Sequence, residues 1–534
     1  MFYSQTNVPI EFAFTAQNHY KDIFNDIEVD VVFTGPDGQE WKVPAYWAGE
    51  NTFRVRFAAP KQGRYTYKSI CTNPDDAGLH GQVGELKVLP YDGQNKLYKH
   101  GGLRAAATKR TLEHADGTPF FWLGDTWWMG LCKRIDWPGG FRTLTADRVE
   151  KGFSVIHIVA GLYPDMPWYD ERGANEAGFP WDKDFTRINP AYFDMADLKI
   201  EWLVRSGLAP CIVASWGYLL LWTGVESMKK HWRNLVARYG AYPVFWCLAG
   251  EVGMPYYLTK DREGDIAFQK KNWTEIARYV RSIDPYHRPL TAHPAHEKRG
   301  SKELEEPDLV DFNWLQTGHS DRESIPNTVK LVVEAYESKP TMPVINSEVC
   351  YEGIGEQCRQ EVQRFMFWSC VLSGACGHSY GANGIWQVNQ RDKPYGPSPH
   401  GMAWGNTSWE DASQLPGSGQ LGLAKRLLER YEWWRFEPHP EWVEPHWTEE
   451  KYSAPFAGGI PGEVRVIYLS WYHPNAVVKD IEKVADYRAY LWNPVDGSEQ
   501  DLGAVTPDAD GNWPLPMPSL PLLQDWVLVL ERKK

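Results

Sequence analysis

The sequence predicts a multidomain α/β protein, in which a central (β/α)8 TIM barrel is flanked by N-terminal and C-terminal β-sandwich domains. Strand-like and helix-like segments alternate eight times over about 300 residues, which is typical of this barrel. The segments before and after this stretch alternate apolar and polar residues. A chain of 534 residues is also too long for one core. We expect domains at 1–92, 93–440 and 441–534.

The N-terminal region has the pattern of a small β-sandwich. Turn-forming sequences such as Gly-Pro-Asp-Gly at 35–38 separate its segments. The predicted half-buried strands are 29–33, 52–57, 64–68 and 85–89. Residues 91–118 are expected to form a connector.

The central region reads as eight strand–helix units. Its apolar runs are typical of parallel strands buried on both faces. The predicted strands are 120–125, 154–160, 208–214, 244–250, 289–293, 309–314, 344–347 and 377–386. The predicted helices include 146–152, 190–207, 226–239, 266–283, 328–338 and 357–373. Two stretches rich in Gly, Pro and Trp, 161–189 and 386–420, are predicted to be long loops that build a substrate site.

Alternation returns near the C-terminus. The segments 464–469, 487–492 and 525–530 are predicted strands, and 493–497 is a predicted turn. We expect a second β-sandwich packed against the barrel.

Composition excludes several classes of partner. The formal net charge is −13 and no basic cluster occurs, so we expect no nucleic-acid partner. No apolar run is long enough to cross a membrane, and the N-terminus lacks the basic and apolar parts of a signal peptide. We therefore expect a cytoplasmic protein, or a secreted one if a signal peptide has been removed. The sequence does not exclude a homo-oligomer.

Cysteine and aromatic usage add two expectations. The eight Cys show no CxxC pair or metal-ligand spacing, so reduced, buried thiols are expected. Aromatic residues make up 14% of the chain, with 27 Trp and 27 Tyr. Part of this excess is expected to line a sugar-binding cleft, because sugar rings stack on indole and phenol rings, and part to fill the sandwich cores.

Two glutamates close two of the predicted strands. Glu251 ends the run 243–251, and Glu348 ends the run 343–348. The C-terminal ends of barrel strands meet in one cleft, and a pair of carboxylates there is what glycoside hydrolysis requires. We expect Glu251 to be the acid/base, with a pKa raised by burial or by its neighbour, and Glu348 to be the ionised nucleophile. The alternative is that one of them is a structural ion-pair residue.

Further polar and aromatic side chains lie at or near strand ends and are candidates to bind a carbohydrate substrate. They are Asp125, Trp127, Trp216, His293, Gln316, His319, Tyr380 and Trp386. Asp125 could instead cap a helix or brace a loop. The histidines could bind hydroxyl groups, orient the nucleophile or serve structural roles.

No cofactor and no metal are expected. His293 and His296 could in principle bind zinc, but no HExxH motif is present. The Gly-Ser-Gly at 417–419 lacks the GxSxG pattern of serine hydrolases. Two alternatives to a glycosidase stay open: a carbohydrate-binding barrel without turnover, and a metal-dependent barrel hydrolase.

The segment 116–128, Asp-Gly-Thr-Pro-Phe-Phe-Trp-Leu-Gly-Asp-Thr-Trp-Trp, resembles the start of the barrel in the apiosidase-like glycoside hydrolases. Those enzymes are related to the retaining clan A, whose acid/base and nucleophile follow strands four and seven. The N-terminal segment resembles the small sandwich that precedes such barrels. The tail from 487 onward is similar to a sandwich of the collagen-binding type.

The resemblance implies a retaining glycosidase acting on oligosaccharides or glycosides from plant or microbial polysaccharides. An apioside is one option for the substrate, and other pentofuranosides such as arabinofuranosides, galactofuranosides and ordinary pyranosides stay open. The missing export signal favours short, imported substrates and hence exo-action. Gly250 stands where clan A enzymes carry a sugar-binding Asn before the acid/base, so their substrate contacts are not carried over.

Overall fold

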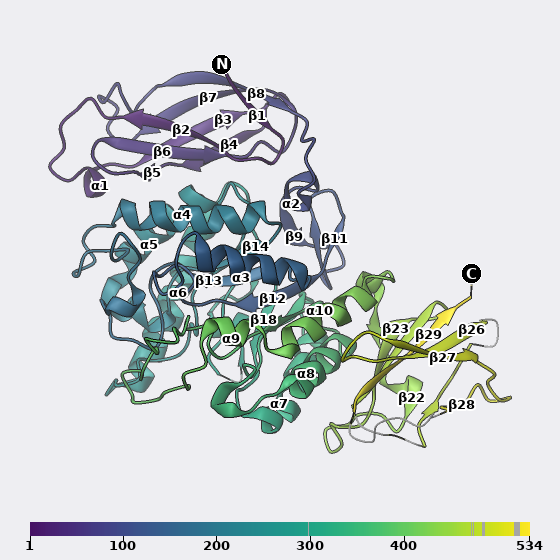
Figure 1. Cartoon of the computed structure of the whole chain (residues 1–534). Coiled ribbons are helices and arrows are strands. Elements are labelled where there is room, and N and C mark those ends of the chain that lie inside the picture. Colours follow the sequence, from purple (N-terminus) through teal and green to yellow (C-terminus); the bar gives the residue numbers. More distant parts are fainter. Residues whose placement is uncertain (297, 471–472, 474, 483–485, 517–523, 534) are drawn as a thin grey trace.

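The computed structural model describes residues 1–296, 298–470, 473, 475–482, 486–516 and 524–533. Figure 1 shows a central α/β region between an N-terminal group of sheets (purple) and a C-terminal group (yellow). No helix in the described part of the chain is long and apolar enough to cross a membrane.

The central region contains one curled sheet of nine strands. Each of the eight predicted strands overlaps a strand of this sheet, and these eight run parallel. They are β12 (Trp122–Thr126), β13 (Val155–Val159), β14 (Ala209–Val213), β15 (Phe245–Cys247), β16 (Leu290–Thr291), β18 (Asn313–Gln316), β19 (Val344–Glu348) and β20 (Gly377–Tyr380). The ninth strand, β17 (Lys298–Arg299), pairs antiparallel with β18 and was not predicted.

The sheet curls because β12 pairs with both β13 and β20, which brings the first and last predicted strands together. The two edge strands of the sheet are β16 and β17. Between β16 and the segment that leads into β18, the Asp311 N–H donates to the Leu290 carbonyl at 2.8 Å. Within the described residues, β16 and β18 do not pair as strands, since β16 is two residues long and β17 occupies the free edge of β18. The structure therefore has a curled nine-strand sheet rather than the expected closed ladder of eight.

Helices follow the strands in the predicted order. They are α3 (Gly139–Glu150), α4 (Pro190–Arg205), α5 (Leu220–Tyr239), α6 (Arg262–Ile283), α7 (Ile325–Glu337), α8 (Gln360–Leu372), α9 (Trp409–Ser413) and α10 (Pro416–Leu428). The prediction of an uninterrupted loop at 386–420 is wrong, because it contains α9 and the start of α10. Gly422 lets α10 approach another segment closely, since a Cβ there would lie 1.8 Å from the Lys151 carbonyl oxygen.

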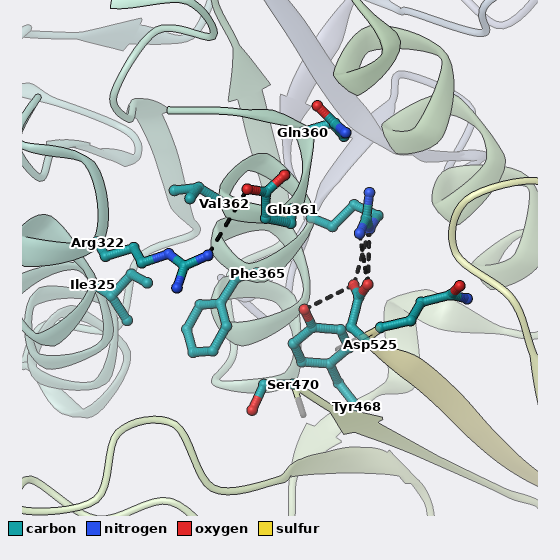
Figure 2. A pocket seen from close by; sticks show the side chains of 11 residues that line it. Arg322, Ile325, Gln360, Glu361, Val362, Phe365, Tyr468, Ser470 and Asp525 are labelled. Carbon is teal, nitrogen blue, oxygen red and sulfur yellow. Dashed lines mark hydrogen bonds and ion pairs between the residues drawn. The ribbon is translucent and has the colours of Figure 1, made fainter. Parts of the chain in front are cut away.

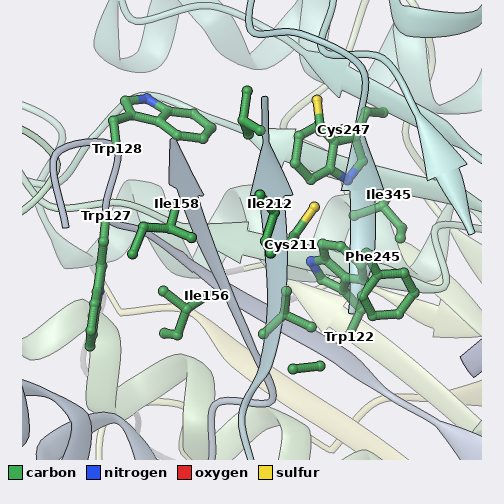
Figure 3. Packing of buried hydrophobic residues seen from close by; sticks show 14 of the residues in the cluster. Trp122, Trp127, Trp128, Ile156, Ile158, Cys211, Ile212, Phe245, Cys247 and Ile345 are labelled. Atoms are coloured by element: carbon green, nitrogen blue, oxygen red, sulfur yellow. The ribbon is translucent and has the colours of Figure 1, made fainter. Parts of the chain in front are cut away.

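Aromatic and branched side chains fill the inside of the curled sheet (Figure 3). Trp122 packs against Phe245 at 4.6 Å between ring centroids and against Trp314 at 5.9 Å. The residues of β12 to β15 are all buried, as the continuous apolar runs predicted. All eight cysteines are buried and free. This packing makes the sheet a rigid base for side chains at the strand ends.

The N-terminal region forms two sheets around one core. The strands are β1 (Phe2–Gln5), β8 (Val83–Leu89), β7 (Gly63–Cys71), β3 (Val29–Thr34) and β4 (Glu40–Pro44) in one sheet, and β2 (Ile10–Thr15), β6 (Thr52–Phe57) and β5 (Tyr46–Trp47) in the other. Phe33 and Phe57 stack between them at 4.0 Å. Arg56 links β6 to the central region by donating to the Arg238 carbonyl and to Asp197.

The predicted connector at 91–118 has structure of its own. It contains α2 (Lys96–Lys99) and the strands β9 (Leu103–Ala105) and β10 (Leu112–His114), and β10 pairs with β11 (Pro119–Phe120). The connector therefore adds a small antiparallel sheet beside the central region.

The C-terminal region also forms two sheets with a shared core. One contains β21 (Glu437–Pro438), β23 (Phe456–Ile460), β24 (Val464–Leu469), β29 (Trp526–Arg532), β26 (Tyr487–Trp492) and β27 (Glu499–Ala504), and the other β22 (Val443–Glu444), β25 (Val477–Val478) and β28 (Trp513–Pro514). All three predicted strands are present. Where this region meets α8, Arg364 forms a buried ion pair with Asp525. The Tyr468 hydroxyl also donates to Asp525 (Figure 2). A cavity of about 340 Å³ lies beside this pair.

Candidate active site

The two predicted catalytic glutamates lie in one cleft at the C-terminal ends of the strands. Glu348 is the last residue of β19, and Glu251 follows β15 after a short extension in which Gly250 bridges to Trp216. The cleft has a volume of about 260 Å³. Six of the ten residues predicted for the site line it: Trp216, Glu251, Gln316, His319, Glu348 and Trp386.

Glu348 is buried and held between two histidines. Its Oε2 lies 2.7 Å from His293 Nε2, and its Oε1 lies 2.9 Å from His319 Nε2. The other ring nitrogen of His293 is 2.9 Å from the Pro294 carbonyl oxygen, so both nitrogens of this ring face acceptors and both carry protons. His293 is thus a buried imidazolium paired with the Glu348 carboxylate.

The electrostatics of this pair follow from the contacts. Burial alone would raise the pKa of Glu348, but the charge and hydrogen bond of His293, together with His319, more than offset burial and lower the pKa well below its usual range. Burial lowers the pKa of His293, but the negative charge of Glu348 and its hydrogen bond raise this pKa by more, so the net shift is upward. Glu348 is therefore ionised at neutral pH.

Glu251 has the opposite environment. Burial, and then the negative charge of Glu348, raise the pKa of Glu251 to about 7. Its Oε2 accepts a hydrogen bond from Trp216 Nε1 at 3.2 Å, and its Oε1 accepts one from Gln316 Nε2 at 3.2 Å. The backbone φ of Glu251 is 42°, in the left-handed region that long side chains rarely adopt, and such positions cluster at functional sites. A glutamate with this pKa holds a proton that it can give up near neutral pH.

Gln316 joins the two carboxylates. Its Nε2 lies 3.2 Å from Glu251 Oε1 and 3.3 Å from Glu348 Oε1, so one amide nitrogen contacts both glutamates. The two carboxylate oxygens therefore lie close together across the cleft.

Gly250 is required by the packing of Trp216. A Cβ at position 250 would lie 2.2 Å from the Trp216 ring. The indole occupies the space that a side chain would take, and its N–H bonds to the neighbouring Glu251. This contact explains physically why glycine precedes the candidate acid.

Three residues predicted to bind substrate serve the interior instead, and that prediction is corrected for them. Asp125 is fully buried, and its Oδ2 accepts from Arg148 Nε at 2.6 Å and from Trp127 Nε1 at 2.7 Å. Trp127 is buried against Phe141. The Tyr380 hydroxyl donates to Glu352 at 2.5 Å. None of the three lines the cleft, because their contacts point into the packed core. His293 also does not line it, and contacts Glu348 from outside the cleft.

The structure adds cleft residues that sequence reasoning did not single out. They include Trp128, Asp165, Tyr257, Tyr351, His400 and Trp404. Asp165 and Tyr257 belong to the connections that follow β13 and β15, and His400 and Trp404 to the connection that follows β20. The length of the predicted loops at 161–189 and 386–420 was the available signal, but loop length does not show which side chain turns inward. Among the described residues, no group of three or more His, Cys, Asp or Glu is arranged to hold a metal ion.

Comparison with known proteins identifies the family of the central region. Residues 106–435 match the family model of the apiosidase-like catalytic domain. Residues 6–72 match a domain of unknown function, DUF5060. No curated protein matches the sequence.

Solved structures share the fold. One named as a glycoside hydrolase is 22% identical, with a TM-score of 0.68, and the match covers 82% of this chain and 98% of that chain. A glycoside hydrolase family 5 protein from Bacteroides vulgatus ATCC 8482 is 21% identical, with a TM-score of 0.68, over 82% of this chain and 94% of the other. Another protein of that strain is 15% identical, with a TM-score of 0.72, over the whole length of both chains. Since the family match spans more than half of the sequence, the chain belongs to the apiosidase-like glycoside hydrolases and is a glycosidase.

Proposed function

We propose that the protein is a retaining, exo-acting glycosidase with Glu251 as acid/base and Glu348 as nucleophile. The observation that carries the proposal is the shared contact of both carboxylates with Gln316 Nε2, at 3.2 and 3.3 Å. Two carboxylate oxygens that accept hydrogen bonds from the same nitrogen cannot be separated by most of the distances of roughly 6.5–9.5 Å that inverting enzymes need to hold a water molecule. The geometry favours the separation of roughly 5–5.5 Å found in retaining enzymes.

The proposed reaction has two steps. An oxygen of Glu348 attacks the anomeric carbon while Glu251 gives its proton to the glycosidic oxygen, so the bond to the leaving group breaks and a glycosyl ester forms on Glu348. Glu251, now a carboxylate, then takes a proton from water. That water attacks the anomeric carbon and releases Glu348 as a carboxylate. The imidazolium of His293 keeps Glu348 ionised before the attack and stabilises it as a leaving group afterwards.

Several features support the other parts of the proposal. The curled sheet with its parallel strands acts as a (β/α)8 barrel whose strand ends carry the catalytic residues. The sheets at 1–92 and 441–534 act as two sandwich domains that flank it. A cleft of about 260 Å³ is smaller than the roughly 300–1,000 Å³ of sites for drug-sized ligands, which favours a terminal sugar over an internal stretch of polymer. The aromatic walls, including Trp128 and Trp386, suit a neutral pyranoside or a furanoside such as an apioside, arabinofuranoside or galactofuranoside.

The test is turnover of aryl pyranosides and furanosides by the wild type, Glu251→Ala and Glu348→Ala, with and without azide. Glu450→Ala, which removes an exposed glutamate far along the chain, is the matched control. We expect one glycoside to be cleaved, with both site variants losing at least about 100-fold in kcat. Azide should restore turnover and give a glycosyl azide of retained configuration with Glu251→Ala and of inverted configuration with Glu348→Ala. Full activity in both site variants would remove this pair from the mechanism.

A further inference from the structure

A third carboxylate, Asp165, shares the cleft with the two glutamates. It lies in the connection between β13 and α4, and its backbone φ of 59° places it in the left-handed region. Asp tolerates this region better than most residues, and the conformation turns the loop sharply at this point. The two-step reaction described above uses only Glu251 and Glu348, so it leaves Asp165 without a role.

Asp165 is held from two other connections. The Tyr257 hydroxyl donates to its Oδ1 at 2.7 Å, and the Tyr395 hydroxyl donates to its backbone carbonyl at 3.3 Å. Tyr257 follows Glu251 in the connection after β15, and its ring stacks on His400 at 4.2 Å between centroids. Among the described residues, the second carboxylate oxygen of Asp165 receives no hydrogen bond. The side chain is therefore fixed by one oxygen, while the other is available to a ligand.

Among the described residues, Asp165 forms no ion pair with a lysine or an arginine. The described residues that line the cleft include three carboxylates and no Lys or Arg. Arg172, in the same connection, is committed to Asp170 through two hydrogen bonds of 2.9 and 2.8 Å. Burial raises the pKa of Asp165 to about 6, so the group is mainly ionised at pH 7.

We infer that Asp165 contacts the substrate and selects a neutral sugar with free hydroxyl groups over its uronic acid counterpart. The inference rests on the proposed function and names the class of sugar that the same cleft accepts. Sugar hydroxyls donate charge-assisted hydrogen bonds to an ionised carboxylate. A sugar that carries its own carboxylate would instead bring a further negative charge next to the ionised Asp165, in a cleft whose described lining residues include no lysine or arginine.

The test compares Asp165→Asn with Asp184→Asn, which removes the same charge from an exposed position of the same loop. Asn also tolerates positive φ, so the backbone is preserved. The substrates are the 4-nitrophenyl and 2,4-dinitrophenyl glycosides of the sugar that the wild type cleaves. We expect Asp165→Asn to lower kcat/KM by about 10- to 100-fold on both, because a hydrogen bond to a charged group is lost whatever the leaving group. Asp184→Asn should stay within about threefold of the wild type.

Binding of product analogues gives a second readout. The free sugar, and the same sugar oxidised to a carboxylate at its terminal CH2OH group, are compared as inhibitors. We expect the wild type to bind the neutral sugar more tightly and Asp165→Asn to reduce this preference at least about tenfold. Tyr257→Phe, which removes the hydroxyl that holds Asp165, should lower kcat/KM in the same direction by a smaller factor, and it tests the same site should Asp165→Asn prove unstable.

Three outcomes overturn the inference. Activity and sugar preference of Asp165→Asn equal to those of Asp184→Asn would show that Asp165 does not contact the substrate. A loss confined to the 4-nitrophenyl glycoside and restored by azide would make Asp165 the proton donor instead. Failure of the wild type to cleave any glycoside in the panel would overturn the proposed function and this inference with it. The first two outcomes occur with an active wild type and therefore overturn this inference alone.

Discussion

Glu251 and Glu348 are the same residue type in one cleft, but their neighbours shift their pKa values in opposite directions. Glu348 has two histidine partners, one of them a buried imidazolium, whereas Glu251 has an indole N–H and an amide. Neutral donors stabilise a carboxylate less than a cation does. The difference assigns the proton to Glu251 and the negative charge to Glu348, which is the division of roles that a retaining glycosidase needs.

This division predicts the pH dependence of the reaction. Burial and the Glu348 charge raise the pKa of Glu251 to about 7, and the acid works only when protonated, so kcat/KM should fall as the pH rises through about 7. Glu348, whose pKa lies well below its usual range, should not lose its charge at any mildly acidic pH. The measurement is kcat/KM against pH for a glycoside with a poor leaving group. An alkaline limb near the ordinary pKa of glutamate would contradict the assignment.

Single residues show what the sequence could predict about the site. The meeting of Glu251 and Glu348 in one cleft was predictable, because each ends an apolar run and parallel strands end at a common edge. Asp125 also follows such a run, yet it pairs with Arg148 in the interior, and a distant partner on a helix leaves no mark near Asp125 in the sequence. Asp165 was missed for the converse reason: its position depends on the path of a loop, not on a periodic pattern.

At the scale of elements, the contact between the connections after β14 and β15 positions Glu251, the proposed acid. Trp216 follows β14, and its ring covers Gly250, which allows its N–H to reach Glu251. Gly250→Ala should displace this ring, lower kcat by about tenfold and cost about 1–3 kcal/mol of folding stability through overpacking. Gly419→Ala is the control, because a Cβ there meets nothing within 4 Å, and alanine favours a helix by up to about 1 kcal/mol. Urea unfolding measures the folding stability of the two variants, and steady-state kinetics measure their kcat. Equal stability and equal kcat in the two variants would show that the contact between Trp216 and Gly250 does not position Glu251.

The strands were predictable as elements because burial on both faces makes them continuous apolar runs, as in β13 and β14. Helix α10 was not, because it begins Pro-Gly-Ser-Gly, a sequence typical of a loop. Two of its glycines serve contacts with other segments: the Gly417 N–H donates to Glu352, and Gly422 lies against the backbone at Lys151. Such tertiary contacts override local propensity and cannot be read from the segment itself.

At the scale of the whole molecule, a partly buried and a buried ion pair join the flanking sheets to the central region. Arg56 reaches Asp197 from the N-terminal side, and Arg364 pairs with Asp525 on the C-terminal side. Removing one partner of a buried pair typically costs about 3–5 kcal/mol, because the other charge stays buried and unpaired. The three regions are thus connected by specific contacts as well as by the chain, and these contacts support the curled sheet from two sides (Figure 1).

The central claim is that this fold forms a covalent glycosyl ester on Glu348. The most direct measurement is mass spectrometry of the whole protein, and of its peptides, after incubation with the 2-deoxy-2-fluoro, 2,4-dinitrophenyl derivative of the sugar that the wild type cleaves. The account predicts one added fluorosugar per chain, located on the peptide that contains Glu348, and no adduct with Glu348→Ala. Hydrolysis of the substrate with inversion at the anomeric carbon and no adduct, or an adduct on another carboxylate, would contradict it.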